Sequence, residues 1–327
     1  MADPGTELVS DLDDVVEALR LAPSVAVLAH IHPEGDAIGA TLAATLSLRE
    51  AGKIAAPYNA DPLPPGLSSL PGAGEINREV PIRRPFACYL VLDTAGLDRT
   101  GGLLEGRPSD AVVLNVDHHA GNRRFGNVNW VDPHASSAGE MVYRILRQGG
   151  LPIGKEVAAN LYAAILTDTG GFRYGNTTPE ALRAAARLVE CGVAVEEVTA
   201  GLYWNRDSRE WRLLGEVLTN LRVSEDGRIS WIEVTLELLA RVGLRHEAAD
   251  DFIDYARAVH GVEIAVAFKE ISPAEVRVSF RSRGANDVAR VAKQFGGGGH
   301  RNAAGCTLHT SLAEAKAQVL AAAREHL

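Results

Sequence analysis

The feature that most constrains the fold is an alternation of short aliphatic runs with longer helical patterns through residue 191. The runs SVAVLA (24–29), CYLVLD (88–93) and AVVLNVD (111–117) are almost wholly apolar until their ends. Such runs are typical of strands that are buried on both faces of a parallel sheet. Helical patterns are found at residues 10–20, 37–51, 136–149, 154–167 and 179–191. Strands alternating with helices predict an α/β fold with a doubly wound, mostly parallel sheet.

The second half of the chain predicts a smaller α+β domain. Strand patterns are found at residues 228–235, 262–271 and 275–282, and helical patterns at 209–219, 247–259, 286–294 and 311–325. The alternation in VRVSF predicts a strand with one buried face. A Pro- and Gly-rich segment at 61–75 predicts a surface loop. We place the first domain at residues 1–191, the linker at 192–207 and the second domain at 208–327.

Composition excludes several classes of protein. The net charge of −9 argues against a broad basic surface for long nucleic acid, although a small anionic ligand stays compatible with it. The N-terminus lacks the apolar segment of a signal peptide, and no apolar run reaches the roughly 18 residues of a membrane span. The cysteines, Cys88, Cys191 and Cys306, match neither a disulfide framework nor a CxxC metal site. We expect a soluble cytoplasmic protein.

Acidic and histidine side chains follow each of the three predicted strands. In open α/β sheets, ligands bind at the carboxyl ends of the strands, so we expect these side chains to converge. A further acid, in ILTDTGGF, closes the predicted helix 154–167. The residues concerned are His30, Glu34, Asp36, Asp93, Asp117, His118, His119 and Asp168.

Each of these residues also has a plainer explanation. Asp93 and Asp168 could be turn or cap residues, Asp36 could cap the helix that follows it, and the histidine pair could lie on a surface loop. Crowded carboxylates, however, raise one another's pKa, and a cation relieves that repulsion. Histidine and carboxylate ligands without cysteine suit Mn²⁺, Mg²⁺ or Zn²⁺. The number of candidate ligands predicts a site for two ions.

Six short motifs point to a known family. They are HIHPEGDAIG (30–39), DTAGLDRTG (93–101), DHH (117–119), LTDTGGF (166–172), SFRSRG (279–284) and FGGGGHRNAAG (295–305). With these motifs in this order, nearly the whole chain resembles the DHH phosphoesterases that carry an appended DHHA1 domain. The resemblance implies two divalent ions, Mn²⁺ first, with Mg²⁺ or Co²⁺ as alternatives.

The resemblance also implies roles for the candidate ligands. One ion would be held by His30, Glu34 and Asp93, and the second by Asp36, Asp93, His118 and Asp168, with Asp93 bridging the two. His119 would act beside the scissile phosphate as a general acid or charge stabiliser, and Asp117 would orient the histidine pair. His32 stands at the family's Asn-like position. The chain departs from the family at Glu34, where Asp is usual, which predicts an altered first ion site.

The glycine run of the second domain predicts an anion site. Four glycines before a histidine allow close approach of the backbone and expose N–H groups, although a plain flexible turn is the alternative. By resemblance, the substrate contacts would be Arg281, Ser282, Gly298, Gly299, His300 and Asn302. Arg283 would lie on the same strand face as Arg281, as a solvated charge or a second phosphate contact.

The resemblance is strongest to the nanoRNase and pAp-phosphatase branch of the family. It implies hydrolysis of short oligoribonucleotides to 5′-mononucleotides and of 3′-phosphoadenosine 5′-phosphate (pAp) to AMP. Alternatives are a phosphodiesterase for cyclic di-AMP or pApA, a family II-like pyrophosphatase, a RecJ-type exonuclease and a non-catalytic nucleotide sensor. The expected partners are therefore small nucleotides, with neither long nucleic acid nor membrane, and a homodimer is expected by analogy.

Overall fold

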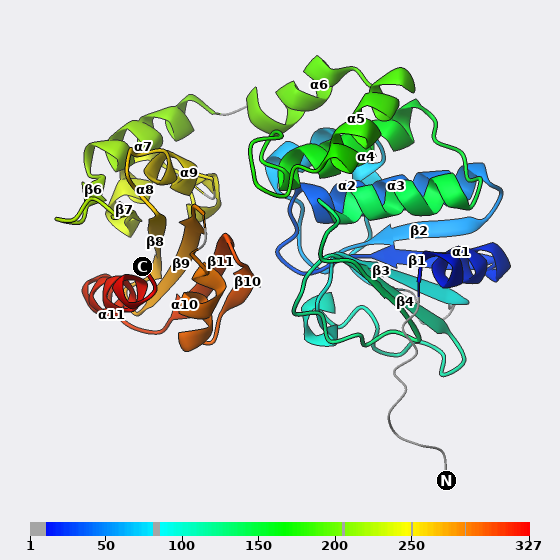
Figure 1. Ribbon diagram of the computed structural model, residues 1–327, viewed down its shortest axis with the longest axis horizontal. Coiled ribbons are helices and arrows are strands. Elements are labelled where there is room, and N and C mark those ends of the chain that lie inside the picture. Colours follow the sequence, from blue (N-terminus) through cyan, green and yellow to red (C-terminus); the bar gives the residue numbers. More distant parts are fainter. Residues whose placement is uncertain (1–10, 81–85, 205–206, 250, 285) are drawn as a thin grey trace, which may run out of the picture. The chain divides into compact units, whose positions relative to one another are not determined.

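The computed structural model of the protein describes residues 11–80, 86–204, 207–249, 251–284 and 286–327 (Figure 1). The chain divides into two compact units, residues 1–205 and 206–327. Within the segment expected as a linker, 192–207, α6 (Val195–Thr199) is followed by a π-helical turn (Ala200–Trp204), and residues 205 and 206 lie outside the described part. The domain limits given above therefore stay a prediction.

The first unit contains a five-stranded sheet in which all neighbouring strands run parallel. The strands are β1 (Ser24–Leu28), β2 (Ile54–Tyr58), β3 (Cys88–Leu92), β4 (Val112–Asp117) and β5 (Val128–Val131), in the order β2-β1-β3-β4-β5. The sequence analysis missed β2 and β5, the two edge strands. Pro57 weakens the strand pattern of β2 but is tolerated at an edge, where one row of N–H groups needs no partner.

The strand order positions the site. From β1 the chain passes to β2 on one side and then to β3 on the other side, so the direction of winding reverses between β1 and β3. At such a reversal the connections diverge and leave a crevice beyond the carboxyl ends of the two strands. The residues that follow β1 and β3 therefore meet at one place.

Helices of the first unit pack against one face of the sheet (Figure 1). They are α1 (Leu12–Leu21), α2 (Gly35–Glu50), α3 (Ala138–Gln148), α4 (Lys155–Asp168) and α5 (Pro179–Glu190). Val25 and Val27 join their core, whereas Ala26 and Leu28 contribute to a second cluster with Leu103 and Leu104. The alternation shows that β1 is buried on both faces, as its apolar run predicted.

Close contact between α2 and α4 depends on a glycine of the first motif. A Cβ atom at Gly39 would lie 2.5 Å from the carbonyl oxygen of Asn160, which is closer than any side chain tolerates. Gly39 therefore lets the two helices approach, and it brings the N-terminus of α2 near the C-terminus of α4. The ends of these two helices carry Asp36 and Asp168.

The second unit has a six-stranded mixed sheet in the order β10-β11-β9-β8-β7-β6. The strands are β6 (Arg222–Val223), β7 (Ile229–Val234), β8 (Ile264–Ser272), β9 (Glu275–Ser282), β10 (Gly298–His300) and β11 (Ala303–Leu308). Among the described strands of this unit, only β7 and β8 pair in parallel. Along β9, buried residues alternate with partly exposed ones, which confirms the predicted half-buried strand. The parallel sheet of the first unit and this mixed sheet together confirm the predicted fold class.

The helices of the second unit cover both faces of its sheet. Val217 of α7 (Ser208–Thr219), Leu239 of α8 (Leu236–Val242) and Ile253 of α9 (Ile253–Arg257) join one core cluster. Val291 of α10 (Val288–Gln294) and Val319 of α11 (Leu312–Glu325) join the other.

One sequence expectation in this unit is wrong, and one alternative is excluded. The helix expected at 247–259 is instead a 3-10 turn (His246–Ala249) followed by the short α9, with residue 250 outside the described part. The glycine run is not a plain loop, because its last two glycines pair with β11 in the edge strand β10.

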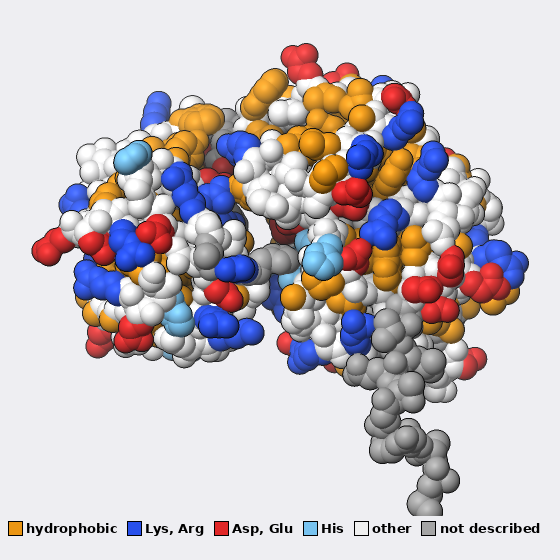
Figure 2. Space-filling view, viewed as in Figure 1, with side chains coloured by type: hydrophobic (Ala, Val, Ile, Leu, Met, Phe, Trp, Pro, Cys, Tyr) orange, Lys and Arg blue, Asp and Glu red, His pale blue; other side chains and the backbone are white. Residues whose placement is uncertain are grey.

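The described surface carries charges of both signs. On the face shown in Figure 2, Lys and Arg side chains are interspersed with Asp and Glu rather than gathered in one basic field. Within the described ranges, no helix combines the length and the apolar character needed to cross a membrane.

Candidate metal centre

The predicted site residues of the first unit come together at the crevice between β1 and β3. His30 follows β1, Asp93 follows β3, Asp117 ends β4, and His118 and His119 follow it. The helix ends complete the set, with Glu34 and Asp36 at the start of α2 and Asp168 at the end of α4. Segments up to 138 residues apart in sequence thus supply one cluster.

Asp93 lies at the centre of the cluster. Its Oδ2 is 3.3 Å from His30 Nε2, and its Oδ1 is 3.3 Å from His118 Nε2. The two oxygens therefore face different imidazoles. The backbone of Asp93 has a φ of +52°, in the left-handed region that costs a non-glycine residue energy. The residue with the strained backbone is thus the one whose carboxylate faces both imidazoles.

Three sets of side chains have ligand atoms close enough to hold a metal ion. One is His30, Glu34 and Asp93; another is Asp36, His118 and Asp168; the third is Asp93, His118 and His119. Within each set the ligand atoms lie within 4.8 Å of one another. The first two sets have no member in common, and Asp93 lies between them through its contact with His118.

Glu34, not Asp36, caps α2. The carboxylate of Glu34 accepts hydrogen bonds from Ala37 N at 2.9 Å and from the N–H of Asp36 at 3.0 Å. The alternative that Asp36 caps this helix is therefore wrong. Glu34 Oε1 also lies 3.7 Å from His30 Nε2, and the Glu34 side chain is about half exposed. The longer side chain thus caps the helix and still reaches the histidine.

Asp36 instead accepts hydrogen bonds from the start of another helix. Its Oδ2 accepts from Ala138 N at 2.6 Å and its Oδ1 from Gly139 N at 2.8 Å, at the N-terminus of α3. The unpaired N–H groups of a helix N-terminus favour an anion. Sequence analysis missed this role of ASSAGE (135–140), although Ser137 before a helical pattern is a typical N-cap.

Asp117 orients one histidine of the pair. Asp117 Oδ1 lies 2.7 Å from His119 Nδ1, and Asp117 Oδ2 accepts from Asn122 Nδ2 at 2.6 Å. Asp117 is fully buried. A carboxylate on Nδ1 fixes the ring and makes the imidazole more basic. Asn122 is a supporting residue that the sequence analysis did not single out.

His30 is held in a comparable way by the backbone. Its Nδ1 lies 2.7 Å from the carbonyl oxygen of Ile31, which directs Nε2 toward Asp93. The guanidinium of Arg99 also donates to Ile31 O, at 3.2 Å. Arg99 belongs to the second motif, but its function in holding this loop was not predicted.

Burial raises the pKa of two acids of the cluster, whereas neighbouring imidazoles lower the pKa of a third. Burial, with repulsion from Asp93, raises the pKa of Asp36 well above its usual value, and burial raises the pKa of Asp168 to about 7. Burial opposes ionisation of Asp93 too, but the imidazoles of His118 and His30 hold its pKa well below the usual range. The environment of the cluster therefore favours the ionised form of Asp93 and the protonated form of Asp36.

The histidines respond to these acids. Burial alone would lower the pKa of His118, but Asp93, Asp168 and Asp36 raise it well above the ordinary value. Asp93 and Glu34 do the same for the pKa of His30, and Asp117 raises that of His119. Protons on these imidazoles thus supply positive charge beside the buried carboxylates.

These residues fit divalent metal ions. Asp93 Oδ1 is buried and accepts no hydrogen bond from the described residues, although ligand atoms of His118 and His119 lie within 3.6 Å. An orphaned carboxylate oxygen among imidazole nitrogens is suited to a cation. The donors are oxygen and nitrogen only, which suits Mn²⁺, Mg²⁺ or Zn²⁺.

His32 does not join the cluster. Its backbone N–H donates to Asp61 Oδ2 at 2.6 Å, and its φ of +55° belongs to a tight turn. The side chain is 64% exposed and belongs to none of the three ligand sets.

The predicted substrate contacts of the second unit lie on β9, β10 and the turn before β11. Ser282 is buried, and its hydroxyl donates to Asn286 O at 2.8 Å. By contrast, Arg281 Nε and Asn302 Oδ1 are buried without a hydrogen-bond partner in the described structure. Arg283 is exposed, and the His300 side chain lies outside the described part.

The glycines of β10 allow backbones to pack closely. Gly299 has a φ of +137°, and a Cβ atom there would lie 2.5 Å from the carbonyl oxygen of Ala303. At Gly298 a Cβ atom would meet nothing within 4 Å. Close packing of the strands therefore accounts for the glycine at position 299 without any ligand. At position 298, by contrast, the space beside the backbone is open.

Fold and site together define an α/β protein with a carboxylate–imidazole centre at the switch point of a parallel sheet. Comparison with known families adds a match of residues 24–165 to the DHH family, N-terminal domain, and of residues 235–327 to the DHHA1 domain. The chain belongs to the DHH family and carries a DHHA1 domain.

Two curated relatives are each a bifunctional oligoribonuclease and PAP phosphatase NrnA. The one from Thermus thermophilus is 37% identical over 96% of this chain and 93% of its own length. The one from Bacillus subtilis is 28% identical over 91% of this chain and 93% of its own length.

Solved structures agree with the fold. An exopolyphosphatase-related protein from Bacteroides fragilis has a TM-score of 0.88 and 25% identity, covering 98% of both chains. RecJ from Thermus thermophilus in complex with Mn²⁺ has a TM-score of 0.51 and 15% identity, covering 98% of this chain and 56% of its own. The likeness to RecJ shows the fold alone.

Proposed function

We propose that this chain is a metal-dependent phosphoesterase that converts short oligoribonucleotides to 5′-mononucleotides and pAp to AMP. The observation that carries the proposal is the position of Asp93, whose two oxygens face His30 and His118 at 3.3 Å each. The names of the two curated NrnA relatives support this choice of substrates.

Both reactions break the same kind of bond. In pAp the 3′-phosphate leaves O3′ of AMP, and in RNA a 5′-mononucleotide is released when phosphorus separates from O3′ of the neighbouring nucleotide. In each case water adds to phosphorus, the P–O3′ bond breaks and O3′ takes up a proton. One centre can therefore serve both substrates.

Two divalent ions, Mn²⁺ first, are proposed as cofactors, with Mg²⁺ or Co²⁺ as alternatives. His30, Glu34 and Asp93 would hold one ion, and Asp36, His118 and Asp168 would hold the other together with Asp93. When bound, such ions activate water for attack and neutralise charge on the phosphoryl oxygens.

The residues of the chain supply position and a proton. Asp117 holds the ring of His119, and against the effect of burial it raises the pKa of His119, which favours the protonated imidazole. The His119 side chain is 23% exposed, so a substrate can reach it. His119 is the proposed general acid that gives a proton to the leaving O3′ or stabilises the charge that forms there.

The second unit is proposed to bind the substrate phosphate and base. Arg281, Ser282, Gly298, Gly299, His300 and Asn302 are the proposed contacts. The buried Arg281 Nε and Asn302 Oδ1 without partners support ligand binding, whereas the Ser282 hydroxyl is already engaged by the backbone. A homodimer and a location in the cytoplasm stay predictions.

The test is hydrolysis by the full chain with added Mn²⁺. We expect pAp and the RNA dinucleotide pApA to be hydrolysed faster than cyclic di-AMP, with AMP as product. Faster turnover of cyclic di-AMP would favour the phosphodiesterase alternative, and faster turnover of pyrophosphate would favour a family II-like pyrophosphatase. Binding of pAp without phosphate release would indicate a nucleotide sensor and refute the proposal.

A further inference from the structure

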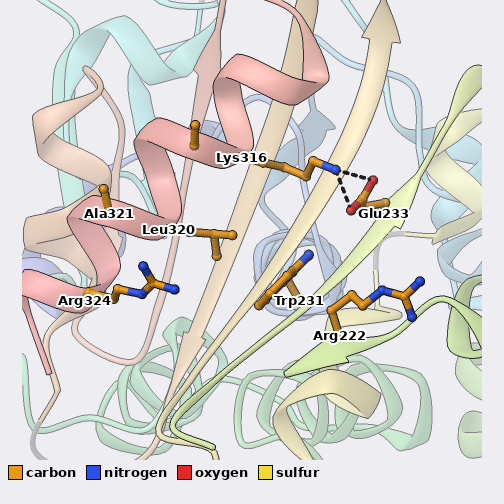
Figure 3. A pocket seen from close by; sticks show the side chains of 8 residues that line it. Arg222, Trp231, Glu233, Lys316, Leu320, Ala321 and Arg324 are labelled. Carbon is orange, nitrogen blue, oxygen red and sulfur yellow. Dashed lines mark hydrogen bonds and ion pairs between the residues drawn. The ribbon is translucent and has the colours of Figure 1, made fainter. Parts of the chain in front are cut away.

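A cavity of about 370 Å³ lies in the second unit, between the edge of its sheet and α11 (Figure 3). Its volume falls in the range of small-molecule sites, about 300–1,000 Å³. Its walls come from β6, β7 and α11. The lining residues are Arg222, Trp231, Glu233, Lys316, Ala317, Leu320, Ala321 and Arg324.

This cavity is separate from the glycine motif of the same unit. β6 and β7 form one edge of the sheet, and β10 forms the opposite edge. Five inter-strand spacings separate β6 from β10, or about 24 Å at about 4.8 Å each. The proposed contacts at Gly298 and Gly299 therefore cannot belong to this cavity.

The floor of the cavity is apolar and aromatic. Trp231 and Leu320 are partly buried, pack against the core cluster and also line the cavity. Ala317 precedes Leu320 by three residues and Ala321 by four, so it shares a face of α11 with each of them. Their small side chains leave room above the indole.

Two arginines flank this floor. Arg222 is directly opposite Trp231 in the antiparallel pairing of β6 with β7, so the two side chains lie on the same face. In Figure 3, Arg222 and Arg324 lie on opposite sides of Trp231. Neither guanidinium has an ion-pair or hydrogen-bond partner among the residues described.

The remaining charges of the cavity cancel each other. Lys316 Nζ lies 2.9 Å and 3.0 Å from the two carboxylate oxygens of Glu233. This pair leaves the charge of Arg222 and Arg324 uncompensated. An exposed arginine by itself is usually only a solvated charge. Two that flank one aromatic ring and line one cavity form a site for an aromatic anion.

We propose that this cavity binds a nucleotide phosphate, with the base against Trp231 and the phosphate held by Arg222 and Arg324. Aromatic side chains stack on nucleobases of any sequence, and the planar guanidinium matches phosphate oxygens in bidentate geometry. The nucleotide comes either from free mononucleotide or from a trailing residue of an RNA. Binding there does not rest on the function proposed for the metal centre.

The first test is quenching of tryptophan fluorescence by AMP in the full chain with EDTA. We expect AMP to quench the fluorescence of the wild type but not that of Trp231→Phe. In the double variant Arg222→Ala/Arg324→Ala, the AMP concentration at the midpoint should rise about tenfold or more, because two charge-assisted hydrogen bonds are lost. Adenosine lacks the phosphate, so its quenching midpoint should be similar in the wild type and in the double variant. Arg147→Ala, an exposed arginine of α3 in the first unit, is the matched control and should leave the midpoint unchanged.

The second test identifies the source of the nucleotide. If an RNA supplies it, the double arginine variant should raise KM for a pentanucleotide severalfold but not for pApA. If free mononucleotide supplies it, both KM values should stay unchanged while AMP quenching weakens. The KM measurements require that the chain hydrolyses RNA as proposed. A protein that shows AMP quenching but no hydrolysis would therefore contradict the proposed function and leave the proposed nucleotide site standing. Equal AMP midpoints in wild type and double variant, or no Trp231-dependent quenching at millimolar AMP, would overturn the proposal.

Discussion

The metal-free protein should become less stable as the pH rises from 6 to 8, and Asp168 is the main measurable cause. Burial raises the pKa of Asp168 to about 7, far above its ordinary value of 3.8. Because the folded pKa is the higher one, the folded state binds the proton more tightly. Its contribution to stability is complete below pH 3.8 and disappears as the pH rises through about 7.

The expected size of the effect follows from linkage. A folded pKa of about 7 and an unfolded pKa of 3.8 give a loss of roughly 1 kcal/mol of unfolding free energy between pH 6 and pH 8. Asp36, His30 and His118 also have raised pKa values, so any titration of theirs in this range adds to the loss. The lowered pKa of Asp93 acts only as the pH falls below the usual carboxyl range.

The assay is urea unfolding of EDTA-treated protein at pH 6 and pH 8 and at constant ionic strength. Asp168→Asn removes the titrating carboxyl, so the difference in unfolding free energy between the two pH values should shrink by roughly 1 kcal/mol. Glu156→Gln, an exposed acid on the same helix, should leave the difference as in wild type. Stability that rises with pH, or an unchanged difference in Asp168→Asn, would refute the reasoning.

The stabilisation of the protein by Mn²⁺ should increase with pH, opposite to the trend in the stability of the metal-free protein. Ions compete with protons for the same ligands, so binding is tighter when the acids and imidazoles have lost their protons. The increase in melting temperature on adding Mn²⁺ should therefore be larger at pH 8 than at pH 6. An equal increase at both pH values would contradict displacement of protons from this cluster.

Three further predictions concern single residues. Asp93→Asn should keep the backbone, since Asn tolerates a positive φ, but should abolish hydrolysis and the stabilisation by Mn²⁺ in a thermal melt; activity near wild type would exclude a central role for Asp93. Glu34→Asp should keep activity equal or higher, while Glu34→Ala should cost about 1 kcal/mol in metal-free urea unfolding through loss of the α2 cap. His300→Ala should raise KM for pAp severalfold with little change in kcat, and a loss confined to metal affinity would place His300 elsewhere.

Much of the first unit could be predicted because local patterns there agree with the tertiary fold. The runs at 24–29 and 88–93 form strands that are buried on both faces, so they are apolar except at their ends and are easily recognised. The edge strands β2 and β5 were missed because one side needs no partner, which permits short strands and a proline. In the second unit, β10 and β11 were missed because glycine and alanine carry little strand preference.

The candidate residues of the metal centre could be predicted from the sequence, because costly polar groups stood at the ends of apolar runs. The contacts of each carboxylate could not be predicted: Glu34 caps α2, Asp36 accepts from the N-terminus of α3, and Asp93 faces two imidazoles. The cavity beside Trp231 likewise depends on the register between β6 and β7 and on the position of α11. Spacing along a chain fixes which side chains share an element, but distances between elements arise only when strand order and helix packing bring them together.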